Sequence, residues 1–571
     1  MAERIIMPKA GMSMEFGTII KWLKEVGDKV EYGEPILEIE TDKTSMQVEA
    51  MNDGYILSKL YEAGAEVPVV TTIGYIGEKG EKPPEGDAPA AKVPAAKAAQ
   101  EAAPAAKAAP KGNKEYDIIV LGGGPAGYIA AIKASRLGAK TAIVEKSALG
   151  GTCLNRGCIP TKTYLKTAEI IHEAMEAKKR GVIFKDLTYT VNMKDVVAEK
   201  NGVVKKLVSG VTGLMKSNGI DVYQGEGRIR KDKTVVIDGK ETIAADKVIF
   251  AGGSKVSRIN LKGIDSPAVM TSDDILDLEE LPEKLVVIGG GVVGVEMASA
   301  FRAFGSEVTV LEMMDRIVPG MESELSNMLK QKLQAQGIKI LNGVSISEIE
   351  QKGKKAYVKL KDGDPVEADK ILLSIGRVPD LSGIEDIEVA VDERGRVKVD
   401  DGMKTNIDWI WAPGDSNGRT MLAHAAFHMA EIAAANAMGA NERYTGKYIP
   451  ACIYTTPELA SVGMKEEDAR KTHDVSVGKF FFAGNGRALA SGAGDGFIKV
   501  VTDSKTGEIL GVHIIGPCAA EMINEACALM TMEITAYEVP TIVHAHPSFS
   551  EALMEAVADS IGESLHLPRK K

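Results

Sequence analysis

One glycine-rich turn occurs twice in this chain, each time in the same surroundings. The first copy, Gly122-Gly-Gly-Pro-Ala-Gly127, follows the apolar run 116–121 and precedes an alanine-rich segment typical of a helix. The second copy, Gly289-Gly-Gly-Val-Val-Gly294, follows the apolar run 285–288 in the same way. A strand–turn–helix of this kind presents backbone N–H groups to a phosphate, so each copy predicts a dinucleotide site in an α/β domain.

Each copy continues to a second apolar strand that ends in a glutamate. Glu145 and Glu312 both lie 23 positions after the first glycine of their turn. That spacing is typical of the carboxylate that binds ribose hydroxyls. One glycine turn alone would be a weak signal, but two in register predict two bound nucleotides, one per domain. The glycines predicted to surround the two pyrophosphates are Gly122, Gly124 and Gly127, and Gly289, Gly291 and Gly294.

Glu312 also indicates which nicotinamide nucleotide the second turn binds. A carboxylate at this position favours a free ribose hydroxyl and repels a 2′-phosphate. Met313 and Met314 follow it, where arginines would suit a phosphate. The sequence therefore predicts NAD in preference to NADP.

Two cysteines lie close behind the first turn. Cys153 and Cys158 are five positions apart and begin eight residues after Glu145. They could be inert core residues or half of a metal site, although a metal site normally has a second close pair. Five residues of straight helix rise about 7.5 Å, whereas a disulfide needs Cα atoms about 4.4–6.8 Å apart. A bond between them would therefore require a distorted helix start, which Gly157 permits, and a helix N-terminus would favour the reactive thiolate.

Composition limits the remaining classes of function. A chain of 571 residues is too long for one core, and about three to five domains are expected. The net charge of −11 argues against a nucleic-acid surface, and five cysteines do not make a secreted disulfide scaffold. No apolar run reaches the roughly 20 residues that span a bilayer, and the N-terminus resembles neither a signal peptide nor a transit segment. We expect a cytoplasmic protein with no membrane and no nucleic-acid partner.

Residues 1–79 contain an internal repeat with an offset of 37 positions. Gly17-Thr-Ile-Ile-Lys-Trp-Leu23 matches Gly54-Tyr-Ile-Leu-Ser-Lys-Leu60, and Ile36 matches Ile73. Short β-rich runs between glycine turns are typical of strands. Two similar copies predict a small β-sandwich with quasi-twofold symmetry.

Asp42-Lys43-Thr44 lies between the two copies, at the predicted tip of a hairpin. A lysine on a turn is usually only a solvated charge. Residues 1–79 nevertheless resemble a lipoyl domain, in which the lysine at the hairpin tip carries lipoate in amide linkage. The related biotin carriers place methionines beside the lysine, and this chain does not. The resemblance implies covalent lipoate on Lys43.

Residues 80–113 are rich in alanine and proline and contain no aromatic residue. Such a segment cannot bury a core, and its prolines recur too often for one stable helix. It predicts a linker with a root-mean-square span of about 30 Å if flexible. A tether of this kind raises the local concentration of the domain it carries.

Near the other end of the chain, Glu551 follows His546 by five positions. In a turn that leads into a helix, the carboxylate is close enough to bond the imidazole. A single histidine is usually a satisfied surface or core residue. A His–carboxylate pair is a better candidate base, because the acid orients the ring and stabilises its charged form.

Residues 114–571 resemble the dihydrolipoamide dehydrogenases of the pyridine nucleotide–disulfide oxidoreductase family. Besides the two turns, the resemblance rests on five motifs: Gly151-Thr-Cys-Leu-Asn-Arg-Gly-Cys-Ile-Pro-Thr-Lys162, Ile375-Gly-Arg-Val-Pro379, Ala412-Pro-Gly-Asp415, Met421-Leu-Ala-His424 and His544-Ala-His-Pro547. It implies a lipoyl β-sandwich, then an α/β flavoprotein with two dinucleotide-binding domains and an α+β dimerisation domain. The implied limits are 114–260 for the FAD-binding domain, 261–385 for the NAD-binding domain, 386–450 for a central domain that completes the FAD site, and 451–571 for the interface domain.

The resemblance also implies a role for each site residue. FAD would contact Glu145, Gly414 and Asp415, with Lys162 and Glu296 paired beside the flavin. NAD would contact Gly376 and Glu312. Cys153 would exchange with lipoyl sulfur and Cys158 would face the flavin. His546, oriented by Glu551, would serve the thiols of the other subunit of a homodimer.

The reaction implied is oxidation of a dihydrolipoyl dithiol to its disulfide with reduction of NAD. The expected partner is a lipoyl-bearing acyltransferase subunit of a 2-oxo acid, acetoin or glycine cleavage complex. Three alternatives stay open. A relative that reduces glutathione or another small disulfide is disfavoured by Glu312 and by the lipoyl domain, and a mercuric reductase by a C-terminal tail without a cysteine pair. A lipoyl carrier or assembly subunit, with the flavoprotein part as a scaffold, would not need the cysteines or the His–Glu pair.

Overall fold

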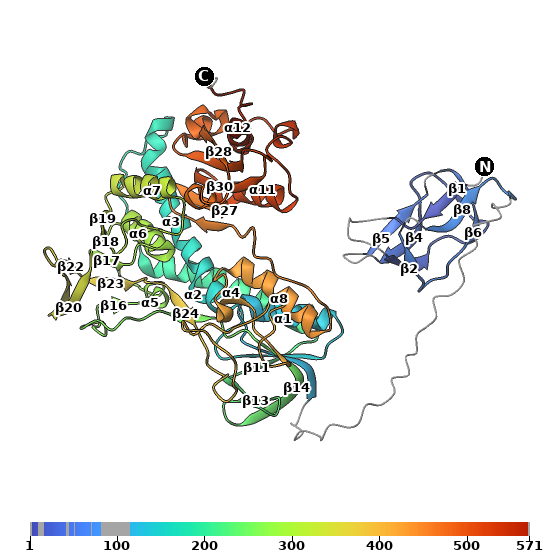
Figure 1. Cartoon of the computed structure of the whole chain (residues 1–571), viewed down its shortest axis with the longest axis horizontal. Helices are drawn as coiled ribbons and strands as arrows, with labels where there is room; N and C mark the ends of the chain where they lie inside the picture. Colours follow the sequence, from blue (N-terminus) through green and yellow to red (C-terminus); the bar gives the residue numbers. More distant parts are fainter. Residues whose placement is uncertain are drawn as a thin grey trace. The chain divides into compact units, whose positions relative to one another are not determined.

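The chain forms two compact units, Met1–Ala106 and Lys107–Lys571 (Figure 1). Lys43 and most of the predicted linker, residues 82–113, lie outside the described residues. The structure is a computed structural model that describes residues 3–8, 16–40, 45–50, 52–69, 71–81 and 115–568.

The N-terminal unit contains two four-stranded antiparallel sheets, ordered β1-β8-β6-β3 and β5-β4-β2-β7. A shift of 37 positions takes β2 to β6, β3 to β7 and β4 to β8, and each strand arrives at the equivalent place in the other sheet. The predicted quasi-twofold β-sandwich is therefore confirmed. The strands are β1 (Glu3–Ile6), β2 (Phe16–Trp22), β3 (Lys29–Val30), β4 (Pro35–Glu40), β5 (Ser45–Glu49), β6 (Gly54–Lys59), β7 (Glu66–Pro68) and β8 (Thr72–Gly77).

Hydrophobic side chains related by this shift meet in the core of the sandwich. Three such pairs are at most 1% exposed: Ile19 and Ile56, Val30 and Val67, and Ile36 and Ile73. On either side of Lys43, strands β4 and β5 pair antiparallel as far as Glu40 and Ser45.

The first sheet of the C-terminal unit has seven strands. Its parallel part is ordered β11-β10-β9-β14, with β25 also paired to β14, and β13 and β12 extend it antiparallel. From Ile118 to Leu121, strand β9 is a continuous apolar run that the sheet buries on both faces. The strands are β9 (Glu115–Leu121), β10 (Thr141–Glu145), β11 (Asp221–Gln224), β12 (Gly227–Ile229), β13 (Thr234–Ile237), β14 (Glu241–Phe250) and β25 (Ile410–Trp411).

The second sheet is parallel and ordered β16-β23-β17-β18-β19. Its segment β19-β18-β17-β23 has the same order as β11-β10-β9-β14, so the two glycine turns occupy equivalent places. The strands are β16 (Val269–Met270), β17 (Lys284–Ile288), β18 (Glu307–Glu312), β19 (Lys339–Asn342) and β23 (Lys370–Leu373). Two small antiparallel sheets accompany it: β20 (Ile346–Lys352), β21 (Lys355–Leu360) and β22 (Val366–Ala368), and β15 (Ser254–Val256) with β24 (Arg377–Pro379).

The last sheet is antiparallel and ordered β26-β27-β30-β29-β28. Its strands are β26 (Ala451–Ile453), β27 (Glu458–Gly463), β28 (Val475–Phe481), β29 (Phe497–Asp503) and β30 (Ile509–Gly516). Helices α11 and α12 share a hydrophobic core with it. The α/β part with two nucleotide-type sheets and the α+β C-terminal part are both as predicted.

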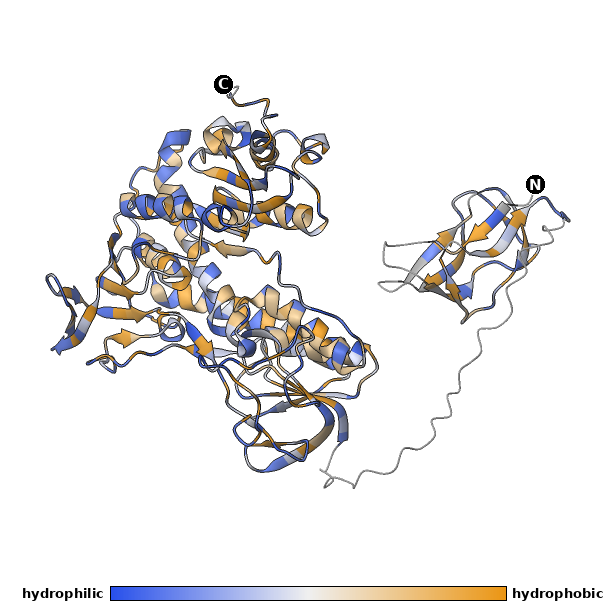
Figure 2. Cartoon of the chain, in the orientation of Figure 1, coloured by the Kyte–Doolittle hydropathy of each residue, from blue (hydrophilic) through white to orange (hydrophobic). Residues whose placement is uncertain are grey.

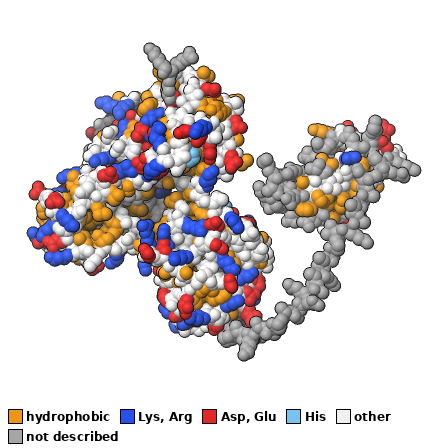
Figure 3. All heavy atoms as spheres, viewed as in Figure 1, with side chains coloured by type: hydrophobic (Ala, Val, Ile, Leu, Met, Phe, Trp, Pro, Cys, Tyr) orange, Lys and Arg blue, Asp and Glu red, His pale blue; other side chains and the backbone are white. Residues whose placement is uncertain are grey.

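Helices cover these sheets, with α1 and α8 packed through alanines against the first one. Figure 2 shows apolar residues concentrated on the sheet strands, and on the face seen in Figure 3 acidic and basic side chains are interspersed. Among the described residues, no helix is both long and apolar enough to cross a membrane. The α-helices are α1 (Pro125–Arg136), α2 (Gly151–Arg156), α3 (Cys158–Glu176), α4 (Met193–Ser217), α5 (Ser272–Ile275), α6 (Val292–Phe304), α7 (Ser323–Ala335), α8 (Ala423–Ala437), α9 (Glu466–Ala469), α10 (Gly486–Ser491), α11 (Ala519–Thr531) and α12 (Glu551–Ser560).

Candidate redox site

The first glycine turn connects β9 to α1. Gly122 has φ +103°, and a Cβ there would lie 2.3 Å from the carbonyl oxygen of Ala251. A Cβ on Gly127 would lie 1.7 Å from the carbonyl oxygen of Gly122, so the turn closes only with glycine at both places. A Cβ on Gly124 would meet only Cα of Gly151, at an ordinary contact distance of 3.8 Å, and within the described part of the chain no side chain caps the N-terminus of α1. Backbone N–H groups are thus available to a phosphate.

The second turn, between β17 and α6, repeats this geometry. Gly289 also has φ +103°, with a Cβ position 2.5 Å from the carbonyl oxygen of Ser374, and a Cβ on Gly294 would lie 2.0 Å from that of Gly289. A Cβ on Gly291 would meet no described atom within 4 Å. Gly376, just beyond the end of β23, is equally open and has φ +106°. Both turns fit a dinucleotide pyrophosphate.

Glu145 and Glu312 end the strands that lie next to the two turns. The backbone N–H of Gly123 donates to Oε2 of Glu145 at 2.6 Å, and that of Gly290 donates to Oε2 of Glu312 at 2.6 Å. Both glutamates are buried. Each carboxylate therefore lies directly against its turn, the position from which an acid binds a ribose.

Asp415 lies in a short 3-10 helix, Gly414–Asn417, close to the first turn. A Cβ on Gly414 would lie only 3.0 Å from the Cβ of Ala126 in α1, and its φ of +78° also favours glycine, so glycine suits this close approach. The hydroxyl of Ser254 donates to Oδ2 of Asp415 at 2.6 Å, and Nε of Arg377 donates to that hydroxyl at 2.8 Å. Burial raises the pKa of Asp415, and these two neighbours oppose the rise. A half-buried carboxylate beside the turn fits the polar chain of a flavin dinucleotide.

The two cysteines lie on either side of a break in the helix. Helix α2 ends at Arg156, Gly157 has a non-helical backbone (φ −141°, ψ −111°), and α3 begins at Cys158. A Cβ on Gly157 would lie 3.0 Å from the carbonyl oxygen of Thr152. The segment therefore contains the distortion that a bond between the two cysteines would require. Cys153 and Cys158 are free thiols that hydrogen-bond to each other.

This hydrogen bond gives the two thiols opposite acidities. The bond from Cys153 lowers the pKa of Cys158 to about 7, against the effect of burial, and the nearby ammonium of Lys162 lowers it further. The same bond raises the pKa of Cys153. Above pH 7 the pair therefore carries one thiolate, on Cys158, which is the reactive form of sulfur.

Lys162 is held one turn further along α3 by an acid from the second nucleotide domain. Its Nζ donates to both carboxylate oxygens of Glu296 at 3.0 Å, and the side chain of Glu296 is only 3% exposed. The backbone N–H of Tyr454 donates to the same carboxylate at 2.9 Å, and Nζ lies 4.3 Å from the centre of the Tyr454 ring. The pair joins α3 to α6 near the thiols, and Tyr454, just after β26, contacts both of its members.

Removing this ammonium in Lys162→Met will raise the pKa of the thiol pair. The reduced wild-type protein should react with iodoacetamide with a midpoint near pH 7, because the thiolate forms as the pH rises through the pKa of Cys158. The midpoint should move to higher pH in Lys162→Met and stay in place in Lys166→Met, which removes an exposed lysine of the same helix. An unchanged midpoint in Lys162→Met would show that Lys162 does not act on the thiols.

His546 and Glu551 form a hydrogen-bonded pair at the start of α12. Nδ1 of His546 lies 2.8 Å from Oε1 of Glu551, and the backbone N–H of Ser548 donates to Oε2 at 2.7 Å. Burial opposes the charge of Glu551, but these two bonds outweigh it and lower the pKa of Glu551. The His546 side chain is 79% exposed. Within residues 115–568, no hydrogen bond or ion pair joins it to either redox cysteine of its own chain.

Sequence reasoning assigned no function to three residues of the site: Ser254, Arg377 and Tyr454. Arg377 lies in a motif that was recognised, but Ser254 and Tyr454 carry no local signal. Ser254 is 161 positions from Asp415, and Tyr454 is 158 positions from Glu296. Only the packing of the domains brings these groups together.

Comparisons with known families divide the chain in the same way. Residues 116–430 match the family described as Pyridine nucleotide-disulphide oxidoreductase, and residues 449–557 match the dimerisation domain of that family. Residues 3–76 match the biotin- and lipoyl-attachment family described as Biotin-requiring enzyme.

Curated relatives cover most of the chain. It is 40% identical over 473 residues to a dihydrolipoyl dehydrogenase of Bacillus subtilis, covering 79% of this chain and 99% of the relative. It is 39% identical over 464 residues to the dihydrolipoyl dehydrogenase of Thermus scotoductus, with 80% and 99% covered. Among solved structures, the HOCl-induced flavoprotein disulfide reductase RclA from Escherichia coli is 28% identical with a TM-score of 0.71, and LpdA from Mycobacterium tuberculosis is 25% identical with a TM-score of 0.72. Each covers 78% of this chain and 99% of the other.

The matches agree with the geometry of the two sites. The family implies a flavin and a pyridine nucleotide, and both glycine turns fit a dinucleotide. The matched dimerisation domain supports a homodimer, and the N-terminal match supports attachment of lipoate. The chain belongs to the pyridine nucleotide-disulphide oxidoreductase family.

Proposed function

We propose that the chain oxidises a dihydrolipoyl dithiol to its cyclic disulfide and reduces NAD⁺ to NADH, with FAD bound at the first turn. The observation that carries the proposal is the position of Cys153 and Cys158: they flank the helix break at Gly157, and the start of their segment at Gly151 packs against Gly124 of the first dinucleotide turn. The lowered pKa of Cys158 supports it. The curated relatives named dihydrolipoyl dehydrogenase support the choice of substrate.

The exchange begins with the pair oxidised to a disulfide. A substrate thiolate attacks Sγ of Cys153, the bond to Cys158 breaks, and Cys158 leaves as a thiolate. The second substrate thiolate attacks the substrate sulfur of this mixed disulfide, and Cys153 is released. The substrate has lost two electrons and become a cyclic disulfide, and the protein pair has become a dithiol. When bound, FAD supplies the two-electron acceptor that reoxidises the pair and passes the electrons to NAD⁺.

His546 accepts the proton of the substrate thiol, since only the thiolate is a good nucleophile. Glu551 orients the ring through Nδ1 and leaves Nε2 for the substrate. We infer that His546 serves the cysteines of the other subunit of a homodimer. The exposed ring, unconnected to the cysteines of its own chain in the described region, supports this arrangement.

The test is NADH formation by the full chain, purified with FAD, from dihydrolipoamide and NAD⁺. We expect kcat/KM with NAD⁺ to exceed that with NADP⁺, because the carboxylate of Glu312 repels a 2′-phosphate. The variant Glu312→Ser should have a smaller ratio of kcat/KM with NAD⁺ to kcat/KM with NADP⁺. Faster turnover with NADPH and oxidised glutathione would favour the small-disulfide reductase instead.

We also propose that Lys43 carries lipoate and that the arm delivers it within a multienzyme complex that holds a lipoyl-bearing acyltransferase. The match of residues 3–76 and the paired strands on either side of Lys43 support this. Intact mass of the native protein should show one lipoyl adduct, which Lys43→Arg abolishes. The variant should keep its activity with free dihydrolipoamide. A native chain without the adduct contradicts the proposal.

The domain limits belong to the same proposal: lipoyl domain 1–79, linker 80–113, FAD-binding domain 114–260, NAD-binding domain 261–385, central domain 386–450 and interface domain 451–571. The three large sheets support this division, because their strands fall mainly in separate stretches of the chain. Strand β25 of the central domain pairs with β14, which fits a domain that completes the FAD site.

A further inference from the structure

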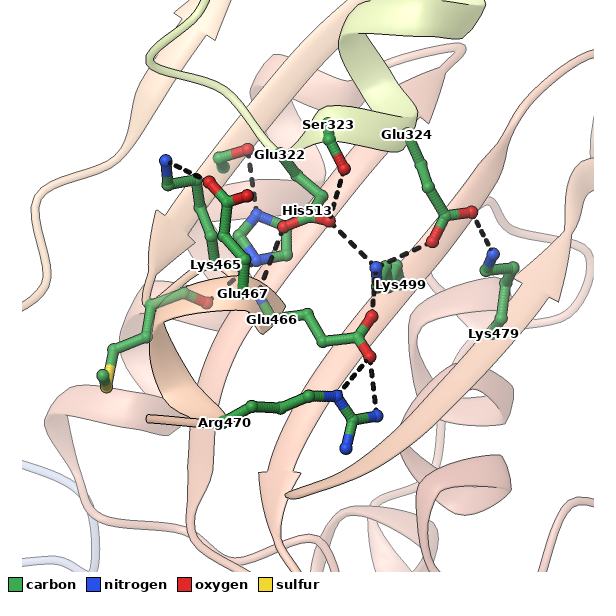
Figure 4. A network of polar contacts seen from close by, with 12 residues as sticks. Glu322, Ser323, Glu324, Lys465, Glu466, Glu467, Arg470, Lys479, Lys499 and His513 are labelled. Atoms are coloured by element: carbon green, nitrogen blue, oxygen red, sulfur yellow. Dashed lines mark hydrogen bonds and ion pairs between the residues drawn. The ribbon is translucent and has the colours of Figure 1, made fainter. Parts of the chain in front are cut away.

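A buried lysine joins the second nucleotide domain to the C-terminal domain. Lys499, on β29, is 1% exposed. Its Nζ lies 2.9 Å from Glu322, 2.7 Å from Glu324 and 2.6 Å from Glu466 (Figure 4). An ammonium has three N–H donors, so the three carboxylates use all of them. Carboxylates this close together could hold a metal ion, but Lys499 already lies between them.

Two of these carboxylates belong to the nucleotide domain and one to the C-terminal domain. Glu322 immediately precedes α7 and Glu324 lies in it, whereas Glu466 lies in α9. Glu322 is the most deeply held: it is 2% exposed, and its second oxygen accepts the backbone N–H of Glu466 at 3.2 Å. Lys479 and Arg470 balance the outer charges on Glu324 and Glu466. The cluster therefore fixes the start of α7 against the C-terminal domain.

A loop of residues 313–322 leads from Glu312 to this cluster. It is hydrogen-bonded to the second glycine turn. Its backbone N–H at Val318 donates to the carbonyl oxygen of Gly290 at 2.8 Å, and Glu312 accepts the N–H of Gly290 at 2.6 Å. The backbone N–H of Gly290 is thus bonded by Glu312, which precedes the loop, and its carbonyl oxygen by Val318 within the loop. Immediately after Val318 the loop makes a turn, in which the N–H of Met321 donates to the carbonyl oxygen of Val318.

Val318 itself has φ +41°, an unfavourable conformation for a β-branched residue. Strain of this kind persists only where the surrounding structure stabilises it. Here hydrogen bonds and ion pairs fix both ends of the loop, at Glu312 and at Glu322. The Lys499 cluster supplies the end at Glu322.

We propose that Lys499 is a positioning residue for the pyridine nucleotide, acting through Glu322 and the 313–322 loop on the turn at Gly290. The inference rests on the proposed function, because it takes that turn as the NAD site. Lys499 lies in a different domain from the turn and touches no part of it directly in the described structure.

The test compares Glu322→Gln and Lys499→Met with Lys332→Met in the full-length protein purified with FAD. Lys332 also joins α7 to the C-terminal domain, through Asp495 at 2.5 Å, but at the far end of the helix from the loop. NADH binding is measured by calorimetric titration, together with KM for NAD⁺ and for dihydrolipoamide. We expect Glu322→Gln and Lys499→Met to weaken NADH binding about tenfold and to raise KM for NAD⁺ similarly, the size of effect known for coupled networks. In both variants KM for dihydrolipoamide should stay within about twofold of the wild-type value. In Lys332→Met the NADH affinity and both KM values should also stay within about twofold of wild type.

Folded variants that bind NADH as the wild type does would overturn the proposal. So would loss of folding in both variants, since the cluster would then serve stability alone. A wild-type chain that binds no NADH would instead contradict the proposed function. Binding measured without turnover separates this positioning role from any effect on the thiol chemistry.

Discussion

Replacing Cys153 by serine will reduce dihydrolipoamide-dependent NADH formation by at least about a thousandfold, because the exchange then has no sulfur to attack. Serine cannot form the mixed disulfide, and Cys158 alone cannot cycle between thiol and disulfide. The loss should appear in kcat and kcat/KM under steady-state conditions. NADH binding should be unchanged, because the second turn lies in another domain.

Cys452→Ser is the matched control for this prediction. Burial raises the pKa of Cys452 to about 12, so its thiol is inert at neutral pH, and activity should stay within about twofold. Near-normal turnover in Cys153→Ser would rule out the disulfide exchange. It would favour the alternative in which the flavoprotein part is a scaffold.

Replacing His546 by glutamine will lower kcat/KM for dihydrolipoamide by about 10²–10⁴-fold, the usual worth of a general base. Glutamine keeps polarity and approximate size but cannot accept the thiol proton. His473→Gln is the control: this half-exposed histidine bonds to Thr472, and the variant should keep full activity. Equal activity in the two variants would remove His546 from the mechanism.

The two variants together test whether His546 acts on the cysteines of the other subunit. Cys153→Ser and His546→Gln chains, co-expressed with different tags and purified as mixed dimers, should recover roughly half of the wild-type activity, because one of the two sites then contains an intact cysteine pair and an intact histidine. If each site used residues of a single chain, both sites of the mixed dimer would be broken. Absence of recovery would therefore contradict the contribution of His546 across the interface.

Much of the fold could be predicted because its signals are local. An apolar strand, a glycine turn and a helix follow each other within 30 positions at Gly122 and again at Gly289, and the backbone geometry of each turn is imposed by its own glycines. The 37-position repeat predicted the β-sandwich for the same reason, since equivalent apolar residues such as Ile36 and Ile73 must face the same core. The break at Gly157 could be expected only on the condition that the two cysteines form a disulfide.

The polar network of the site was only partly predictable. Lys162 and Glu296 could be paired through family resemblance although they are 134 positions apart. The Lys499 cluster carries no motif, and Lys499 and Glu322 are 177 positions apart. In the sequence both residues look like ordinary charged surface residues, and only the tertiary fold buries them.

The sequence by itself determined the strand–turn–helix at each nucleotide turn, the repeated strands of residues 1–79, the thiol pair and the His–Glu pair, because each depends on a local pattern of residues. Tertiary structure alone decided how Ser254 reaches Asp415, how Tyr454 reaches Glu296 and how Lys499 meets its three carboxylates. The physical reason is that these contacts form between the faces of different domains. Their geometry depends on how whole sheets and helices pack, which no short stretch of chain encodes.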